Sequence, residues 1–182
     1  MVFSEKEINR RNTQIVNYLN KNRLNGFIIT NPCNIFYLDL NHLSTERPVV
    51  YFVHFSGEVT LFVTSIEEME STKLKHINNL KVYFEFPGEK DVFQWTIQEL
   101  KSFYSNLKNI VIDSAEERLF QKWNAEFDNL KVNDFIYQMR LTKSDEEVEH
   151  LKIAANYADV IVDYGVKHYQ PGKSELELLA EM

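Results

Sequence analysis

The sequence predicts a mixed α/β fold, in which a mixed β-sheet is flanked by helices, and three observations support this. At 49–63, two runs rich in β-branched and aromatic residues flank a Ser-Gly turn, which is the pattern of a β-hairpin. Beyond the hairpin, short apolar runs alternate with segments of helical periodicity. A segment of helical periodicity also precedes the hairpin. Hairpin strands pair antiparallel, whereas strands joined through helices pair in parallel, so a mixed sheet is expected.

The first helix is predicted over residues 4–24. Ser4 and Glu7 have the Ser-x-x-Glu spacing of a capping box, which marks a helix start. Arg11 is placed at the edge of the apolar face that follows. Residues at helical spacing form that face: Ile8, Ile15, Tyr18 and Leu19.

The next expected elements are four strands. "GFIIT" at 26–30 is a continuous apolar run that ends at the turn residues Asn31 and Pro32. "IFYL" at 35–38 predicts a second, shorter strand. The two arms of the hairpin follow at 49–55 and 58–63.

Between residues 65 and 139, helices and strands alternate. Capping-box spacings at Ser65/Glu68 and Ser114/Glu117 begin two of the helices. Apolar residues of period two indicate a strand that ends at a Pro-Gly turn. The predicted strands are 81–86, 109–113 and 130–134, and the predicted helices are 65–75, 90–106, 114–127 and 135–139.

Two further helices are predicted after a polar linker at 140–144. Ser144 and Glu147 begin the first, and Ser174 begins the second after a Pro-Gly turn. The first carries an apolar stripe without an evident partner to pack on: Val148, Leu151, Ala155, Ala158 and Val162.

Composition restricts the classes of partner. The 182 residues are 44% hydrophobic and carry a formal net charge of -7, with no basic cluster that would bind nucleic acid. A single cysteine, Cys33, excludes an internal disulfide and favours the cytoplasm. No signal-peptide pattern begins the chain, and no apolar run approaches the roughly 20 residues that span a bilayer. Neither a nucleic-acid nor a membrane partner is therefore expected.

No catalytic residue and no metal ligand is predicted within the chain. Ser56-Gly57 lacks the flanking glycine of a nucleophile elbow, and Asp113 ends a strand without an identifiable partner. Two-metal hydrolysis needs a convergent set of carboxylates and histidine. No two histidines have the three- or four-residue spacing that places both on one helix face: His42, His54, His76, His150 and His168.

The junction "MRLTKSDEEVEHLKIAANYADVIVDYGVKHYQPGKSELELLAEM" resembles that of the creatinase/prolidase group of metallopeptidases. Upstream, "GFIITNPCNIFYL" and "ERPVVYFVHFSGEVTLFV" are similar to the start and the hairpin of the amino-terminal domain of that group. One departure is Asp39-Leu40-Asn41, where the group often has Thr-Gly-Phe. The matching junction positions are Arg140, Lys143, Ser144, Glu147, Ala154, Ala155, Pro171, Gly172, Glu175, Glu177 and Leu178.

The resemblance implies a ribonuclease H-like amino-terminal domain at 1–139, followed at 140–182 by a linker and the first helices of a truncated catalytic domain with the pita-bread fold. In the group, two Asp, one His and two Glu of that domain hold two divalent metal ions of the Mn, Co or Zn class. The reaction is cleavage of Xaa-Pro bonds by a proline dipeptidase or an Xaa-Pro aminopeptidase. The partners implied are the missing catalytic domain, a second copy in a homodimer and a proline-containing peptide.

This chain alone is expected to be inactive, with a role in shaping the substrate entrance and the dimer interface. The candidates for that role lie in a polar loop: His42, Glu46 and Arg47. Arg47 is suited to bidentate recognition of a carboxylate. The alternative is a solvated loop in which Arg47 pairs with Glu46 or another acid.

Two other functions remain open at this point. The chain could be a stand-alone interaction module that retains the fold without peptidase activity. It could also be an enzyme with an unrecognised site on the sheet domain.

Overall fold

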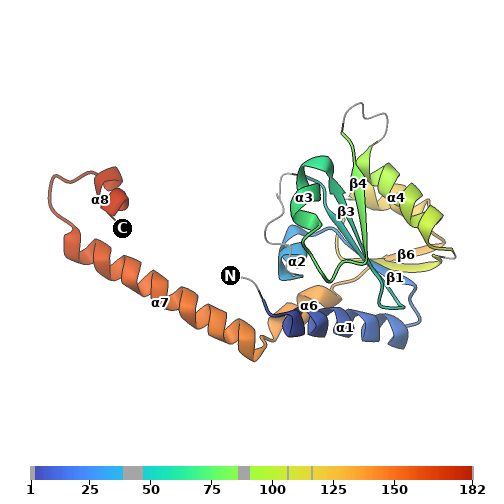
Figure 1. Cartoon of the computed structure of the whole chain (residues 1–182), viewed down its shortest axis with the longest axis horizontal. Coiled ribbons are helices and arrows are strands. Elements are labelled where there is room, and N and C mark those ends of the chain that lie inside the picture. The colour runs from blue at the N-terminus through green and yellow to red at the C-terminus, as the bar shows by residue number, and fades with distance from the viewer. Residues whose placement is uncertain (1–2, 39–46, 86–90, 106, 116, 182) are drawn as a thin grey trace. The chain divides into compact units, whose positions relative to one another are not determined.

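The computed structural model describes residues 3–38, 47–85, 91–105, 107–115 and 117–181. The chain forms two compact units, and the division between them falls between Leu141 and Thr142. The first unit contains a β-sheet with helices, and the second contains two helices (Figure 1).

The first unit is built on a six-stranded sheet with the strand order β4-β3-β2-β1-β5-β6. β2 runs antiparallel to both of its neighbours, β1 and β3, whereas the other three pairs are parallel. The mixed sheet predicted from the sequence is therefore confirmed. The strands are β1 (Gly26–Ile29), β2 (Val50–His54), β3 (Val59–Thr64), β4 (Asn79–Tyr83), β5 (Asn109–Ile112) and β6 (Asn129–Val132).

Helices cover both faces of the sheet (Figure 1). Successive strand residues point to opposite faces, so Phe27 and Ile29 pack with α1, α2 and α6, whereas Ile28 packs with α4 and α5. Each face thereby has its own apolar core. The helices of this unit are α1 (Glu5–Lys21), α2 (Pro32–Tyr37), the 3-10 helix η1 (Ser65–Glu67), α3 (Glu68–Ser71), α4 (Val92–Phe103), α5 (Glu117–Asn124) and α6 (Phe135–Leu141).

Local signals explain where several elements begin and turn. The Ser4 hydroxyl accepts a hydrogen bond from the backbone N–H of Glu7 at 3.2 Å, as the predicted helix start requires. Gly57 has φ +96, a left-handed conformation that the hairpin turn needs and that glycine adopts without strain. The hairpin and the first helix are therefore confirmed.

The strand predicted at 35–38 is wrong, because these residues belong to or directly follow the helix α2. The Asn31 side chain accepts from the N–H of Cys33 at 2.9 Å, and Pro32 occupies the first turn. Both features favour a helix start. The apolar run "IFYL" was too short to distinguish a strand from a buried helix by its periodicity.

The helix predicted at 65–75 is also wrong in form. This segment divides into η1 and α3, and its N-cap is Thr64, which makes no side-chain capping bond. The Ser65/Glu68 spacing therefore does not act as a capping box here. Several other elements are shorter than predicted, since apolar periodicity defines the middle of a helix better than its ends.

The second unit consists of α7 (Asp145–His168) and α8 (Glu175–Glu181). Both bonds of a capping box begin α7: Glu147 N–H donates to the Ser144 hydroxyl at 3.2 Å, and Ser144 N–H donates to the Glu147 carboxylate at 2.9 Å. No residue of α7 is buried, and the predicted apolar stripe is exposed. That residues 140–182 begin a catalytic domain stays a prediction. Across the described ranges, no helix combines the length and apolar character that a bilayer crossing requires.

Candidate functional site

Arg47 is the one predicted site residue that the structure places; His42 and Glu46 lie outside the described residues. The Arg47 guanidinium forms an ion pair with the carboxylate of Glu85, just beyond β4. Both side chains remain partly exposed. Arg47 is therefore held by an acid from a distant part of the sequence, and its fork of donors is already partly engaged.

A metal site is not present among the residues that the structure describes. No group of three or more His, Cys, Asp or Glu side chains in those ranges converges as metal ligands. Two-metal hydrolysis requires carboxylates that bridge the ions together with further ligands. These residues therefore do not fit the pair of divalent ions that the resemblance implies.

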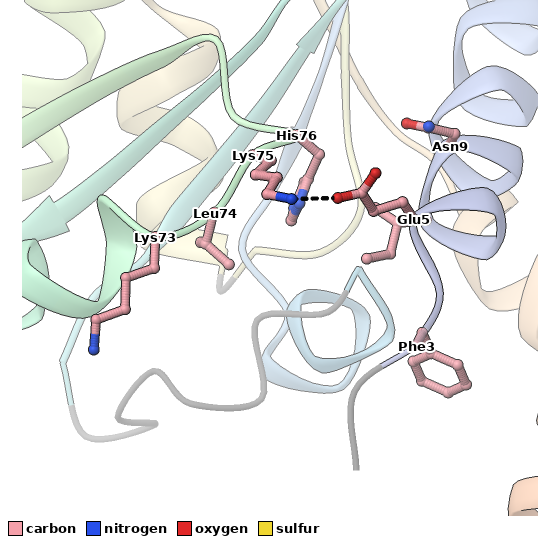
Figure 2. Close-up of a pocket in the computed structure, with 8 residues that line it drawn as sticks. Phe3, Glu5, Asn9, Lys73, Leu74, Lys75 and His76 are labelled. Atoms are coloured by element: carbon pink, nitrogen blue, oxygen red, sulfur yellow. Dashed lines mark hydrogen bonds and ion pairs between the residues drawn. The ribbon is translucent and has the colours of Figure 1, made fainter.

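A pocket of about 270 Å³ lies between the start of α1 and the segment after α3 (Figure 2). Lys75 reaches across it to Glu5, with 2.8 Å between Nζ and Oε1, and this hydrogen bond lowers the pKa of Glu5. Because Glu5 and Lys75 are both exposed and pair with each other, this ion pair offers a ligand little net charge. Its lining includes Phe3, Glu5, Ile8, Leu74, Lys75 and His76.

The carboxylate of Asp113, at the end of β5, is buried and fully engaged. It accepts hydrogen bonds from the backbone N–H groups of Thr30 at 2.9 Å, Asn31 at 3.1 Å and Ser114 at 2.8 Å. The side-chain amide of Asn34 donates a fourth at 2.8 Å. Burial raises the pKa of Asp113, and these bonds oppose that effect. Because its acceptor positions are occupied, Asp113 joins the ends of β1, β5 and α2 rather than serving as a general base.

His54 and Ser56 form a contact that resembles a nucleophile and its base, with 2.7 Å between Nδ1 and the hydroxyl. However, the N–H of Ser56 points to the same ring nitrogen at 3.5 Å, and the N–H of Glu58 points to the hydroxyl at 3.4 Å. The group therefore closes the hairpin turn. Tyr104 stacks on the ring of His54 with 4.7 Å between centroids, which buries part of the imidazole.

The stability of the first unit is expected to fall with acidification below about pH 6.5, in part through His54. Partial burial lowers the pKa of His54, and Glu58 opposes this effect. The unfolded chain therefore binds the proton at a higher pH than the folded chain. The contribution of His54 is complete above the unfolded pKa and is lost as the pH falls through the folded value.

Urea unfolding at about pH 8 and about pH 5.5 measures this dependence. His54→Gln should reduce the difference in unfolding free energy between the two conditions. His168→Gln, which changes an exposed histidine of α7, should leave that difference unchanged. If the unfolding free energies of His54→Gln and of the unsubstituted chain change equally with pH, the contribution assigned to His54 is contradicted.

Sequence reasoning missed the buried contacts of Asn34. Its side-chain amide donates to Asp113 and accepts from Arg140 Nη1 at 3.0 Å. Asn34 follows Asn31-Pro32 by two residues, and Arg140 lies 106 positions further on, so no local spacing reveals the contact. The family resemblance at Arg140 was the one available signal.

No protein-family model matches the chain. An Xaa-Pro dipeptidase of Pyrococcus horikoshii is 26% identical over 177 residues, covering 96% of this chain and 47% of that protein. The solved prolidase of Pyrococcus horikoshii has a TM-score of 0.70 at 20% identity, over 94% of this chain and 46% of its own. The creatinase/prolidase N-terminal domain of an X-Pro dipeptidase of Streptococcus pyogenes has a TM-score of 0.56 at 20% identity, over 72% of this chain and 98% of its own.

These comparisons confirm the resemblance to the creatinase/prolidase group and show that the chain has the fold of its amino-terminal domain. The chain spans about half the length of the curated relatives it matches. The matched portion is the amino-terminal half of those peptidases.

Proposed function

We propose that this chain is the non-catalytic amino-terminal part of an Xaa-Pro metallopeptidase, either a proline dipeptidase or an Xaa-Pro aminopeptidase. In the complete enzyme it would shape the substrate entrance and contribute to a homodimer interface in the cytoplasm. The observation that carries the proposal is the match over nearly the whole chain to one half of an Xaa-Pro dipeptidase.

The exposed apolar surface of α7 also supports the proposal. Leu151, Tyr157 and Val162 are each more than half exposed, although large apolar side chains of a stable helix normally pack on a neighbour. Burial of each would contribute roughly 1.5–3 kcal/mol. We infer that their partner is the remaining part of the pita-bread domain, which would also carry the two divalent ions.

Arg47 is the described residue on which the entrance role can be tested. Its pairing with Glu85 holds the guanidinium near the end of β4. A guanidinium held by one carboxylate retains other N–H donors, which can bind the terminal carboxylate of a peptide. His42 and Glu46 remain predicted members of the same region.

The proposal predicts that the reading frame continues past Met182 for roughly 200 residues, a typical domain size. That segment should encode the two Asp, one His and two Glu of the metal site. Sequencing of the downstream DNA, followed by a dipeptidase assay of the longer product with Mn²⁺, measures both expectations. A stop codon directly after Met182 would contradict the proposal and support a stand-alone interaction module instead.

A further inference from the structure

Three hydrogen-bonded side chains connect the sheet to the last turn of α6. Asn34 Nδ2 donates to Asp113 Oδ2 at 2.8 Å, and Arg140 Nη1 donates to Asn34 Oδ1 at 3.0 Å. Asp113 is 8% exposed and Asn34 is 5% exposed, whereas Arg140 is half-buried. The three residues come from the end of β5, from α2 and from the penultimate position of α6.

The chemistry of the two outer groups determines the orientation of the amide between them. An ionised carboxylate only accepts hydrogen bonds, and a guanidinium only donates them. The Asn34 side chain can satisfy both only with its nitrogen toward Asp113 and its oxygen toward Arg140. Asp113 therefore influences Arg140 although the two residues do not need to touch.

The earlier part of α6 is held by apolar contacts instead. Ile136 is fully buried, and the ring of Phe135 stacks on Tyr18 with 4.0 Å between centroids. Toward the end of the helix, Leu141 is largely exposed. In this last turn Met139 packs, partly buried, against the same core, and Arg140 adds a polar contact from the turn to α2.

We propose that Arg140 is a positioning residue that holds the last turn of α6 on α2, and that Asp113 orients the Asn34 amide that receives it. α6 ends at Leu141 and the second unit begins at Thr142, so this contact fixes the place where the chain leaves the sheet unit. If the sheet unit shapes the substrate entrance, as the proposed function holds, this contact supports substrate binding in the complete peptidase more than the bond-breaking step.

Amide hydrogen exchange on the 182-residue chain tests the contact itself. In Arg140→Ala, the amides of residues 138–141 should exchange about tenfold faster or more, because a charge-assisted hydrogen bond is lost. The amides of β1 should keep the parent rate. Arg140→Lys should restore part of the protection. Gln138→Ala is the matched control, since it removes an exposed hydrogen bond from the same helix to Asp134, the residue before its first turn.

The role of Asp113 is tested through its effect on α6, which it reaches through the Asn34 side chain. Asp113→Asn should also accelerate exchange at 138–141. Its combination with Arg140→Ala should add little further acceleration, because both substitutions disrupt the same chain of hydrogen bonds through Asn34. If Asp113→Asn does not fold, Asn34→Leu removes both hydrogen bonds at similar volume and should give the same result. Unchanged exchange at 138–141 in Arg140→Ala, or additive effects of the two substitutions, would overturn the proposal.

The link to substrate binding is tested in the longer product of the reading frame. Arg140→Ala should raise KM for an Xaa-Pro dipeptide while kcat changes less, and Gln138→Ala should change neither. Faster exchange with an unchanged KM would overturn this link. A longer product without any activity, even unsubstituted, would contradict the proposed function, while the exchange experiment would still decide the contact.

Discussion

Replacing Glu7 with alanine is expected to lower the free energy of unfolding by about 3–5 kcal/mol, because the charge of Arg11 is then left buried without its partner. The Arg11 side chain is 0% exposed, and its Nε donates to Glu7 Oε1 at 2.8 Å. Its guanidinium lies between the rings of Phe3 and Tyr37, at 3.9 and 4.1 Å from their centroids, and donates to the Tyr37 carbonyl. Arginine cannot avoid this cost by losing its proton.

The unsubstituted chain should also lose stability in acid, because the ion pair of Glu7 and Arg11 depends on the charge of Glu7. Hydrogen bonds from Arg10 and then Arg11 lower the pKa of Glu7 from 4.5 to about 2, against the opposing effect of burial. The carboxylate therefore contributes on the order of 3 kcal/mol at neutral pH, which is present above about pH 4.5 and is lost as the pH falls toward 2.

Urea unfolding of Glu7→Ala at neutral pH measures the effect, with Glu5→Ala as the matched control. Both residues are acidic and lie in the first turn of α1, so both interact with the helix dipole. Glu5, however, is exposed, and its substitution should leave stability nearly unchanged. Glu7→Leu combined with Arg11→Met should be less destabilised than Glu7→Ala. Equal stability of Glu7→Ala and Glu5→Ala would contradict the buried pair.

Trp123→Ala is expected to destabilise the first unit by about 3–5 kcal/mol, which is typical when a large aromatic side chain is removed from a core. The eight residues of α5 are all described, and Trp123 is the one among them that is buried. Its ring lies 6.2 Å from that of Phe93 and 6.4 Å from that of Phe127. Trp123 therefore anchors α5 on the sheet.

Tryptophan fluorescence can follow the unfolding of Trp123→Ala. The chain has two tryptophans, and the other one, Trp95, remains as the reporter. The indole N–H of Trp123 has no hydrogen-bond partner among the described residues, so Trp123→Phe should lose volume alone and be less destabilised. Lys122→Ala, at an exposed neighbouring position, should leave the unfolding midpoint where it is in the parent. A Trp123→Ala midpoint close to that of Lys122→Ala would show that α5 is not anchored in this way.

Local signals in the sequence were sufficient for much of the fold. The hairpin was predictable because strand-forming runs and a glycine turn lie within one short segment. The start of α7 was predictable because both partners of its capping box, Ser144 and Glu147, are three residues apart. α2 was not, because its start depends on the Asn31 side chain and Pro32, which equally suit a turn.

The buried polar contacts were not predictable, since each depends on residues far apart in the sequence. Arg11 looks like an edge residue until Tyr37, 26 positions away, is packed over it. Asp113 looks like a strand-end carboxylate free for chemistry until the N–H groups of Thr30 and Asn31 fill its acceptor positions. The pairing of Arg47 with Glu85 spans 38 positions. Composition and spacing contain no record of such long-range contacts.

The most direct measurement is proline release from an Xaa-Pro dipeptide by the purified 182-residue chain, with and without added Mn²⁺. The same rate as in a protein-free sample is expected under both conditions, because the proposed function places the groups that hydrolyse the bond in another segment. Release that requires Mn²⁺, increases in proportion to the chain and stops on addition of a chelator would contradict it.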